Sequence, residues 1–280
     1  MVSSFIKDQI RFFTVISKNK NILFALVQKE LKNRYASSAL GFLWAVLQPL
    51  AAIFIYTIVF SLVFRTSVPD SYKHIPYVIF LMCGLIPYQV FSETVGRSCN
   101  ILLENINMIT KMVFPYELFP VSILIISFII GGITWILTII FMLIIGVEPV
   151  FSNFIYLPLF FIPLILVTIG LSWIVSCLSV VYRDIVHVVP VALNLLFFAT
   201  PVLYSYEMIE KIKPEHSILI MLAKLNPLLA IVEGHRISLI GKTFILDYDT
   251  ILISYIFSFG IFLIGGIIFH IFKRELADLF

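Results

Sequence analysis

The stretch LFPVSILIISFIIGGITWILTIIFMLIIGV, residues 118–147, contains no Asp, Glu, Lys or Arg in thirty consecutive positions. A helix of about 20 apolar residues is long enough to cross the hydrocarbon core of a bilayer, which is about 30 Å thick. Apolar residues would cover every side of such a helix, whereas the helices that cover a water-soluble core are apolar along one stripe. The stretch therefore predicts a membrane-spanning helix.

Five further stretches follow the same pattern, so every Asp, Glu, Lys and Arg of the chain lies outside these six uncharged stretches. The stretches are residues 35–64, 74–92, 149–182, 185–206 and 250–272. The composition is 61% hydrophobic and 12% charged, and the mean hydropathy is +1.07, which excludes a water-soluble globular protein. We expect an all-α, polytopic integral membrane protein with six transmembrane helices between residues 35 and 272.

The basic residues predict which ends of these helices face the cytoplasm. Seven Lys and Arg residues lie within residues 1–34, and others follow the second, fourth and sixth stretches. Because Lys and Arg accumulate in short cytoplasmic loops, both termini are expected to be cytoplasmic, including the tail 273–280. Residues 1–34 are also expected to hold an amphipathic interface helix, since apolar residues recur there at helical spacing among polar ones. These apolar residues are Ile22, Leu23, Leu26, Val27 and Leu31.

The sequence contains no recognisable catalytic, metal or nucleotide motif. Its five histidines are scattered, and its three cysteines have no spacing typical of a disulfide framework or metal site. Gly241, Lys242 and Thr243 match only the end of a phosphate-binding loop, because Arg236 occupies the position of the first glycine. The net charge of +3 lies mostly in the N-terminal arm, where anionic lipid explains it better than nucleic acid. We expect neither an enzyme nor a cofactor site of its own.

The predicted helices have no charged residue near mid-membrane depth, where ion-coupled carriers bind the driving ion. Glu93 lies at the predicted inner end of the second stretch, and His187 and His270 lie at the ends of others. Coupling to protons or sodium therefore has few candidate groups. If the protein transports against a gradient, its energy is expected to come from another protein.

Several strings, in order along about nine-tenths of the chain, resemble the permease subunits of type 2 ABC exporters that carry polysaccharides and polyol phosphates. They are ELKNRYASSALGFLWAVLQPL (30–50), CGLIPYQVFSETVGRS (83–98), LLENINMITKMVFPYELFP (102–120), YRDI (182–185), TPVLY (200–204), LNPLLAIVEGHRISLIG (225–241) and the tail KRELADLF (273–280). Each string alone is a weak signal, but their shared order is specific.

This resemblance implies a permease for a lipid-linked polysaccharide of the O-antigen, capsule or teichoic acid type, in the cytoplasmic (inner) membrane. It implies a homodimer that works with two ATP-binding cassette ATPase subunits, which would bind the ATP and Mg. Six helices can hardly enclose a path as wide as a polysaccharide, which also favours a dimer. Energy would enter this chain from the ATPases through conformational change.

The resemblance also assigns a role to the cytoplasmic segments. Residues 97–117 would form a coupling loop, in which Asn105 is a possible cap of a short apolar helix that docks on the ATPase. Glu104, Asn105 and Lys111 would frame that contact. Arg183 and Asp184, in the short turn between the fourth and fifth spans, are further coupling candidates, although a charge that fixes topology explains them equally well.

The extracytoplasmic loop 205–249 contains two helix-like runs, 218–225 and 228–240, separated by Asn226 and Pro227. We expect two short helices that lie at the outer interface, and the resemblance implies that they shape an exit gate. Glu233 and Arg236 are spaced to pair on the second helix, where a surface pair would contribute a few tenths of a kcal/mol.

Aromatic residues make up 15% of the chain, and six of them form two sets. Tyr56, Phe60 and Phe64 repeat every four residues in the first stretch, and Phe197, Phe198 and Tyr204 lie near the fifth. Aromatic faces can stack on sugar rings, so helices one and five are proposed to line a path for the polymer. Lipid-facing belts and helix packing are the alternative for each residue taken singly.

Two other functions remain open from the sequence. A motor-independent flippase or membrane enzyme acting on lipid-linked glycans would share the topology, but it would need polar active-site residues clustered at one face. A small-molecule exporter of the same superfamily would lack the strings typical of sugar exporters at 30–50 and 225–241.

Overall fold

The computed structural model describes residues 16–35, 38–64, 68–106, 108, 115–205, 207–208, 221, 223–242 and 246–279. These residues form helices joined by turns, bends and short irregular segments, with no strand among them, so the predicted all-α class is confirmed for this part of the chain. The α-helices are α2 (Lys20–Tyr35), α3 (Trp44–Tyr56), α4 (Tyr77–Glu104), α6 (Leu118–Ile144), α7 (Leu157–Val181), α8 (Ile185–Ala199), α11 (Pro227–Ile240) and α12 (Tyr248–Leu279). Short 3-10 segments are η1 (Gly41–Leu43), η3 (Asp70–Tyr72) and η4 (Phe151–Tyr156), and the π-helical η2 (Thr57–Val63) continues α3.

Five helical segments of the described chain are long and apolar enough to cross a membrane. They are Gly41–Ser61, Tyr77–Glu104, Leu118–Ile144, Phe151–Val181 and Tyr248–Phe272. The fifth stretch of the sequence, 185–206, gives only the 15-residue α8, because the chain turns after Ala199. A 15-residue helix is about 22 Å long, which is less than the roughly 30 Å of a hydrocarbon core.

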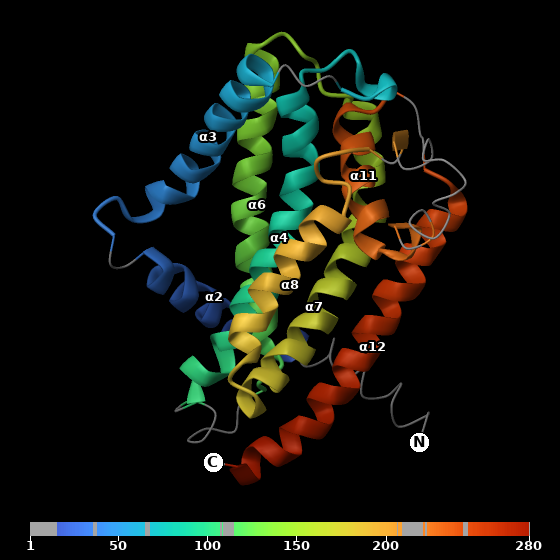
Figure 1. The fold of residues 1–280 in the computed structure, drawn as a ribbon. Helices are drawn as coiled ribbons and strands as arrows, with labels where there is room; N and C mark the ends of the chain where they lie inside the picture. Colours follow the sequence, from blue (N-terminus) through green and yellow to red (C-terminus); the bar gives the residue numbers. More distant parts are fainter. Residues whose placement is uncertain are drawn as a thin grey trace.

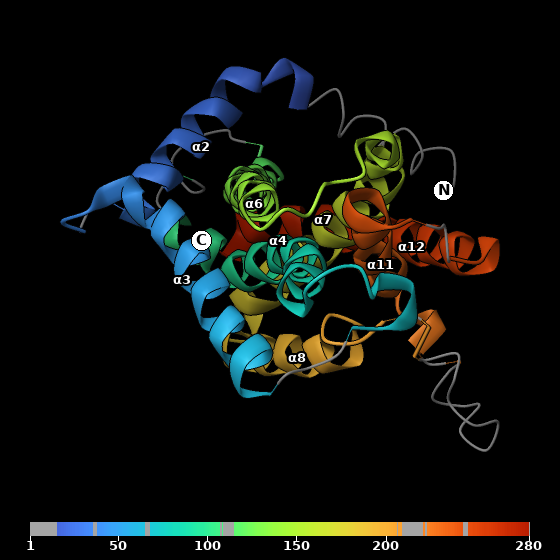
Figure 2. The same ribbon diagram turned by 90° about the horizontal axis from the view of Figure 1, so that it is seen from above.

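Helix α4 is the central element of the bundle. It contacts α6, α7, α8 and α11, which surround it when the molecule is seen from above (Figure 2). Within its most apolar window 83% of the residues are buried, compared with 17% for the α3 segment and 22% for α12. The outer helices are therefore left with apolar faces for lipid or another protein.

Helix α4 is also longer than the sequence predicted. Residues 97–104, which were assigned to a cytoplasmic loop, are its last two turns, and the helix ends only at Glu104. Glu93 consequently lies three turns before the end of a candidate membrane span rather than at its end.

Helices α7 and α12 pack side by side through two glycines (Figure 1). A Cβ atom on Gly170 would lie 2.6 Å from the carbonyl oxygen of Ile261, and one on Gly265 would lie 2.8 Å from the Cα atom of Gly170 and still closer to its carbonyl oxygen. Trp173 packs at a tilt against Phe262 and Phe269, with its ring centroid 5.3 and 6.0 Å from theirs. Small residues allow such close backbone approach between membrane helices.

Helix α2 lies in the part of the chain where the sequence predicts an amphipathic interface helix, and it extends to Tyr35. It contacts α6 and buries Leu23, Leu26 and Val27, while Ile22 of the predicted apolar set is 37% exposed. Figure 1 shows α2 inclined to the long helices of the bundle, near the end opposite the outermost turns of α3 and α6.

Candidate functional site

Helix α11 is the most completely buried helix of the described chain. All thirteen residues from Leu228 to Ile240 are buried, and the helix contacts α4, α7 and α12. The segment therefore packs inside the helix bundle, whereas the sequence predicted a short helix with a surface ion pair. Part of the other expected helix, 218–225, lies outside the described residues.

The helix begins at Pro227, one residue before the predicted run 228–240. Asn226 is the N-cap, and its side chain accepts a hydrogen bond from the Leu228 amide at 3.0 Å. The Asn226 amide also donates to Thr200 Oγ1 at 2.9 Å, just after α8.

Arg236 on α11 is fully buried and collects a ring of oxygen atoms. Its Nη1 donates to the carbonyls of Pro201 (2.7 Å) and Tyr204 (2.9 Å), and its Nη2 donates to that of Val202. Its Nε donates to the carbonyl of Phe80 at 3.2 Å, across 156 residues of sequence. A single guanidinium thus joins α11 to α4 and to the turn that ends α8.

Glu233 completes this arrangement. Its Oε2 accepts from Arg236 Nη1 at 2.9 Å, and both side chains are 0% exposed. Tyr72 donates its hydroxyl to Glu233 Oε1 at 2.7 Å, and burial, followed by the Glu233 charge, raises the pKa of Tyr72 well above its usual value. We call Tyr72, Phe80, Glu233 and Arg236 the Arg236 cluster. The predicted pairing of Glu233 with Arg236 is present, but as a buried pair rather than a surface one.

The packing around Arg236 leaves no room for a larger neighbour. Its Cζ lies 3.8 Å from the ring centroid of Phe80, a cation–π geometry. A Cβ atom on Gly84 would lie 2.8 Å from the same Cζ. Breaking a buried ion pair leaves an uncompensated charge and is strongly destabilising. The cluster can therefore hold α11, α4 and the end of α8 in one arrangement.

A second polar arrangement joins α2 to α4 near the opposite end of the bundle. Arg34 pairs with Glu93, and Arg97 lies 3.5 Å from Glu30. Both helices place a glutamate four residues, about one helical turn, before an arginine: Glu30 and Arg34 on α2, and Glu93 and Arg97 on α4. Each glutamate faces the arginine of the other helix. We call these four residues the α2–α4 ladder.

The predicted coupling residues Glu104 and Asn105 lie at the end of this ladder. Glu104 accepts two hydrogen bonds from Arg97, at 2.7 and 2.6 Å. Asn105 accepts from Lys29 at 2.6 Å and donates to the Ile101 carbonyl at 2.9 Å. Asn105 is the C-cap residue of α4. The sequence alone placed it only at the start of a separate short helix in the coupling loop.

The remaining coupling candidates are less constrained. Lys111 lies outside the described residues. Arg183 and Asp184 are exposed in the turn between α7 and α8, at the same end of the molecule as the end of α4 (Figure 1). Within the described ranges, no ion pair joins them, and no three His, Cys, Asp or Glu side chains gather as metal ligands would.

The two aromatic sets contact α4 at different positions along its length. Phe60 lies between Tyr56 and Phe64, with centroid distances of 6.1 and 6.2 Å, and packs on Tyr77 at 5.1 Å.

In the second set, Phe197 contacts Tyr88 and Phe198, each at 5.3 Å, and the Tyr204 hydroxyl donates to the Phe198 carbonyl at 3.1 Å. Phe64 and Phe198 are 67% and 65% exposed. Tyr77 and Tyr88 are eleven residues apart on α4, about 16 Å along the helix, so the two sets do not merge into one stripe within a single copy.

Sequence reasoning missed the α2–α4 ladder. The spacing of Glu30 with Arg34 and of Glu93 with Arg97 was a usable signal, because residues four apart share a helix face. It also missed the burial of Arg236, for which the sequence carries no local signal, since four of its partners lie at least 32 residues away.

Comparison with known proteins agrees with the strings identified in the sequence. The family model described as ABC-2 type transporter matches residues 22–240. The chain is 31% identical to an O-antigen export system permease protein RfbA of Klebsiella pneumoniae, over 92% of this chain and 95% of the relative. It is 30% identical to the protein of the same name in Myxococcus xanthus, over 81% and 83%. It is 27% identical to the polysialic acid transport protein KpsM of Escherichia coli, over 76% and 78%.

Proposed function

The chain belongs to the ABC-2 type transporter family, and on that premise we propose that it is the permease subunit of an ATP-driven exporter of a lipid-linked polysaccharide. The observation that carries this proposal is the similarity to O-antigen export permeases across nine-tenths of both chains. The polymer would be of the O-antigen, capsule or teichoic acid type. It would cross the cytoplasmic membrane without being chemically changed by this chain.

The working unit that we propose is a homodimer bound to two ATP-binding cassette ATPase subunits, which bind the ATP and Mg. Both termini would lie in the cytoplasm, and α8 would serve as the sixth membrane passage together with the turn that follows it. This orientation puts Glu104, Asn105, Arg183 and Asp184 on the ATPase side. The exposed apolar faces of α3 and α8 would then be free to meet the second copy or lipid.

Helix α4 is the proposed connection between the ATPase and the exit. It is one continuous helix of 28 residues, about 42 Å long, so movement at one end is carried to the other. Its inner end holds Glu104 and Asn105, and its outer end offers the Phe80 carbonyl to Arg236. A displacement of α4 would therefore pull on the Arg236 cluster, and α11 would act as the gate.

A charge exchange tests the coupling role of Glu104. In the triple variant Glu30→Arg, Arg97→Glu and Glu104→Arg, residue 97 can pair again with residues 30 and 104, while the charge presented to the ATPase at position 104 is reversed. We expect export to fall at least tenfold and the ATPase to co-purify less well, because cross-interface charge pairs control partner choice. Full export by the exchanged variant would contradict the contact with the ATPase and leave Glu104 with a role inside α4 only. The control variant is Lys224→Glu, which reverses a charge far from this end of α4.

The aromatic residues Tyr56, Phe60 and Phe64 are proposed to guide the polymer at the outer end of the path. Replacing all three by leucine removes the ring faces but keeps an apolar surface for lipid. We expect export of the glycan to fall severalfold while the amount of folded protein in the membrane is unchanged. The comparison variant is Phe24→Leu in α2, which removes an exposed ring far from the path. Normal export by the triple variant would show that the rings are lipid-facing only.

Deletion of the gene tests the function as a whole. Cells that lack this chain are expected to accumulate a lipid-linked glycan on the inner face of the membrane and to lose the corresponding glycan from the surface. Purification of the tagged full chain is expected to bring an ATP-binding cassette ATPase with it. Unchanged surface glycans in the deletion strain would contradict the proposal.

A further inference from the structure

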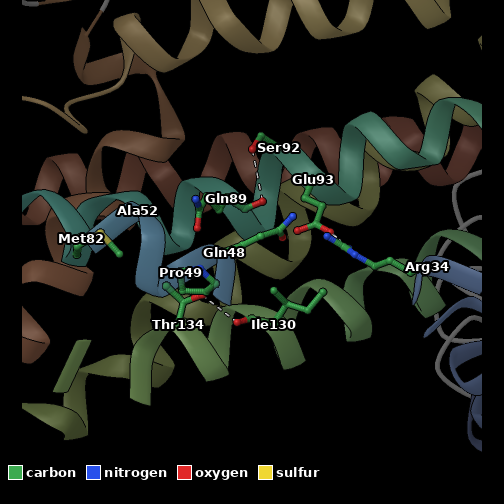
Figure 3. A pocket seen from close by; sticks show the side chains of 10 residues that line it. All are labelled: Arg34, Gln48, Pro49, Ala52, Met82, Gln89, Ser92, Glu93, Ile130 and Thr134. Atoms are coloured by element: carbon green, nitrogen blue, oxygen red, sulfur yellow. Dashed lines mark hydrogen bonds and ion pairs between the residues drawn. The ribbon is translucent and has the colours of Figure 1, made fainter. Parts of the chain in front are cut away.

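A cavity of about 290 Å³, lined by both polar and apolar side chains, lies between α2, α3, α4 and α6. Figure 3 shows Gln48 of α3 and Gln89 of α4 gathered in it beside the pair of Arg34 and Glu93. Gln48 lies in the candidate span Gly41–Ser61, and Gln89 is the thirteenth residue of α4. Polar side chains at such a depth are costly to bury in lipid and are typical of functional sites.

The two glutamine amides have unused hydrogen-bonding capacity. Both side chains are exposed to the cavity, and in the described part of the chain neither amide has a hydrogen-bond partner. Each amide offers two donors and one acceptor oxygen. Ser92 and Thr134 donate their hydroxyl protons to the carbonyls of Gln89 and Ile130, which leaves their oxygens as acceptors toward the cavity. Met82 and Ile130 supply an apolar wall.

The charges around the cavity are balanced, and this determines which ligand fits. Arg34 is paired with Glu93, and Arg97 is paired with both Glu30 and Glu104. A phosphate would need a basic side chain that is not already neutralised. Neutral groups that both donate and accept hydrogen bonds, such as the hydroxyls of a sugar, match the free amides without disturbing these pairs.

The cavity continues toward the inner end of α4. A second cavity, of about 470 Å³, is lined by Glu30, Asn33, Arg97 and Asn100, and it shares Arg34, Ser92 and Glu93 with the first. Ligand pockets usually enclose roughly 300–1,000 Å³. The pair of Arg34 and Glu93 therefore stands between an intramembrane cavity and one that opens toward the cytoplasmic end.

We propose that the cavity between α3 and α4 binds a sugar residue of the lipid-linked glycan through the amides of Gln48 and Gln89, with the Arg34–Glu93 pair as its boundary on the cytoplasmic side. This inference rests on the proposed export function and adds to it a recognition site inside each copy of the chain. The site recognises the sugar rather than the diphosphate that links it to the lipid.

Binding to the full chain in lipid nanodiscs tests this site. The probes are farnesyl diphosphate N-acetylglucosamine and farnesyl diphosphate, titrated and counted by native mass spectrometry. The wild-type chain is expected to bind the sugar-bearing probe about tenfold more tightly, which corresponds to one or two additional hydrogen bonds. Gln48→Leu with Gln89→Leu is expected to remove this preference. Gln28→Leu, on the exposed face of α2, is expected to keep it.

A second variant covers the case in which the double leucine variant does not fold. Ala52→Phe places a ring in the cavity without removing a polar group and is expected to abolish the preference as well. Equal binding of the two probes by the wild-type chain would overturn the site, as would a preference that survives in both folded variants. If deletion cells accumulate the glycan but the wild-type chain shows no preference in nanodiscs, the sugar site is wrong and the proposed export function is not affected. Failure of the site can therefore be distinguished from failure of the export function.

Discussion

Replacing Arg236 by methionine is expected to lower the free energy of unfolding by about 3–5 kcal/mol, the cost of leaving one partner of a buried ion pair alone. The variant leaves the Glu233 carboxylate buried with only the Tyr72 hydroxyl as a donor. It also removes the donor from the carbonyls of Phe80, Pro201, Val202 and Tyr204. We therefore expect most of the purified protein to unfold well below the melting temperature of the wild type.

Unfolding can be followed with a thiol-reactive dye, because Cys83, Cys99 and Cys177 are buried and free. The second variant, Arg236→Met with Glu233→Gln, removes the isolated charge and is expected to recover part of the loss. Arg183→Met is the matched control, because Arg183 is exposed, and it is expected to melt with the wild type. If Arg236→Met also melted with the wild type, Arg236 would not be the buried connection described above.

Replacing Gly265 by alanine is expected to destabilise the protein by about 1–3 kcal/mol, the usual cost of overpacking. The new methyl group would lie 2.8 Å from the Cα atom of Gly170 and still closer to its carbonyl oxygen. This backbone cannot move without separating α7 from α12. Gly260→Ala is a control in the same helix, since nothing lies within 4 Å of its Cβ position. Because alanine is the better helix former, that control is expected to be neutral or slightly stabilising.

The same thiol assay measures both glycine variants. Equal melting temperatures for Gly265→Ala and Gly260→Ala would contradict the close crossing of α7 and α12. A loss confined to Gly265→Ala would support it, because the two substitutions add the same methyl group to the same helix.

The sequence predicted elements whose signal is local. The uncharged stretch 118–147 became α6, Leu118–Ile144, because hydropathy depends on consecutive residues. The break at Asn226 and Pro227 was correct because capping and the missing proline N–H act within one helical turn. The order of the strings gave the family, which the match over residues 22–240 confirms.

Features set by distant partners were not predictable in this way. α8 is shorter than its apolar stretch because the chain turns at Pro201, where Arg236 binds the carbonyls. The apolar pattern of residues 228–240 is the same for a surface helix and an inserted one, so the burial of α11 could not be derived from it. Glu93 was taken for an interfacial charge because the partner on α2, Arg34, lies 59 residues earlier.

Reconstituted vesicles provide the most direct test of the central claim that this chain takes its energy from a separate ATPase. Lipid-linked glycan is loaded in the outer leaflet of vesicles whose permease cytoplasmic face points outward, and its arrival inside is measured. We predict net glycan uptake only when the partner ATPase, ATP and Mg are all present on that face. Uptake against a gradient with this chain as the sole protein would contradict the account.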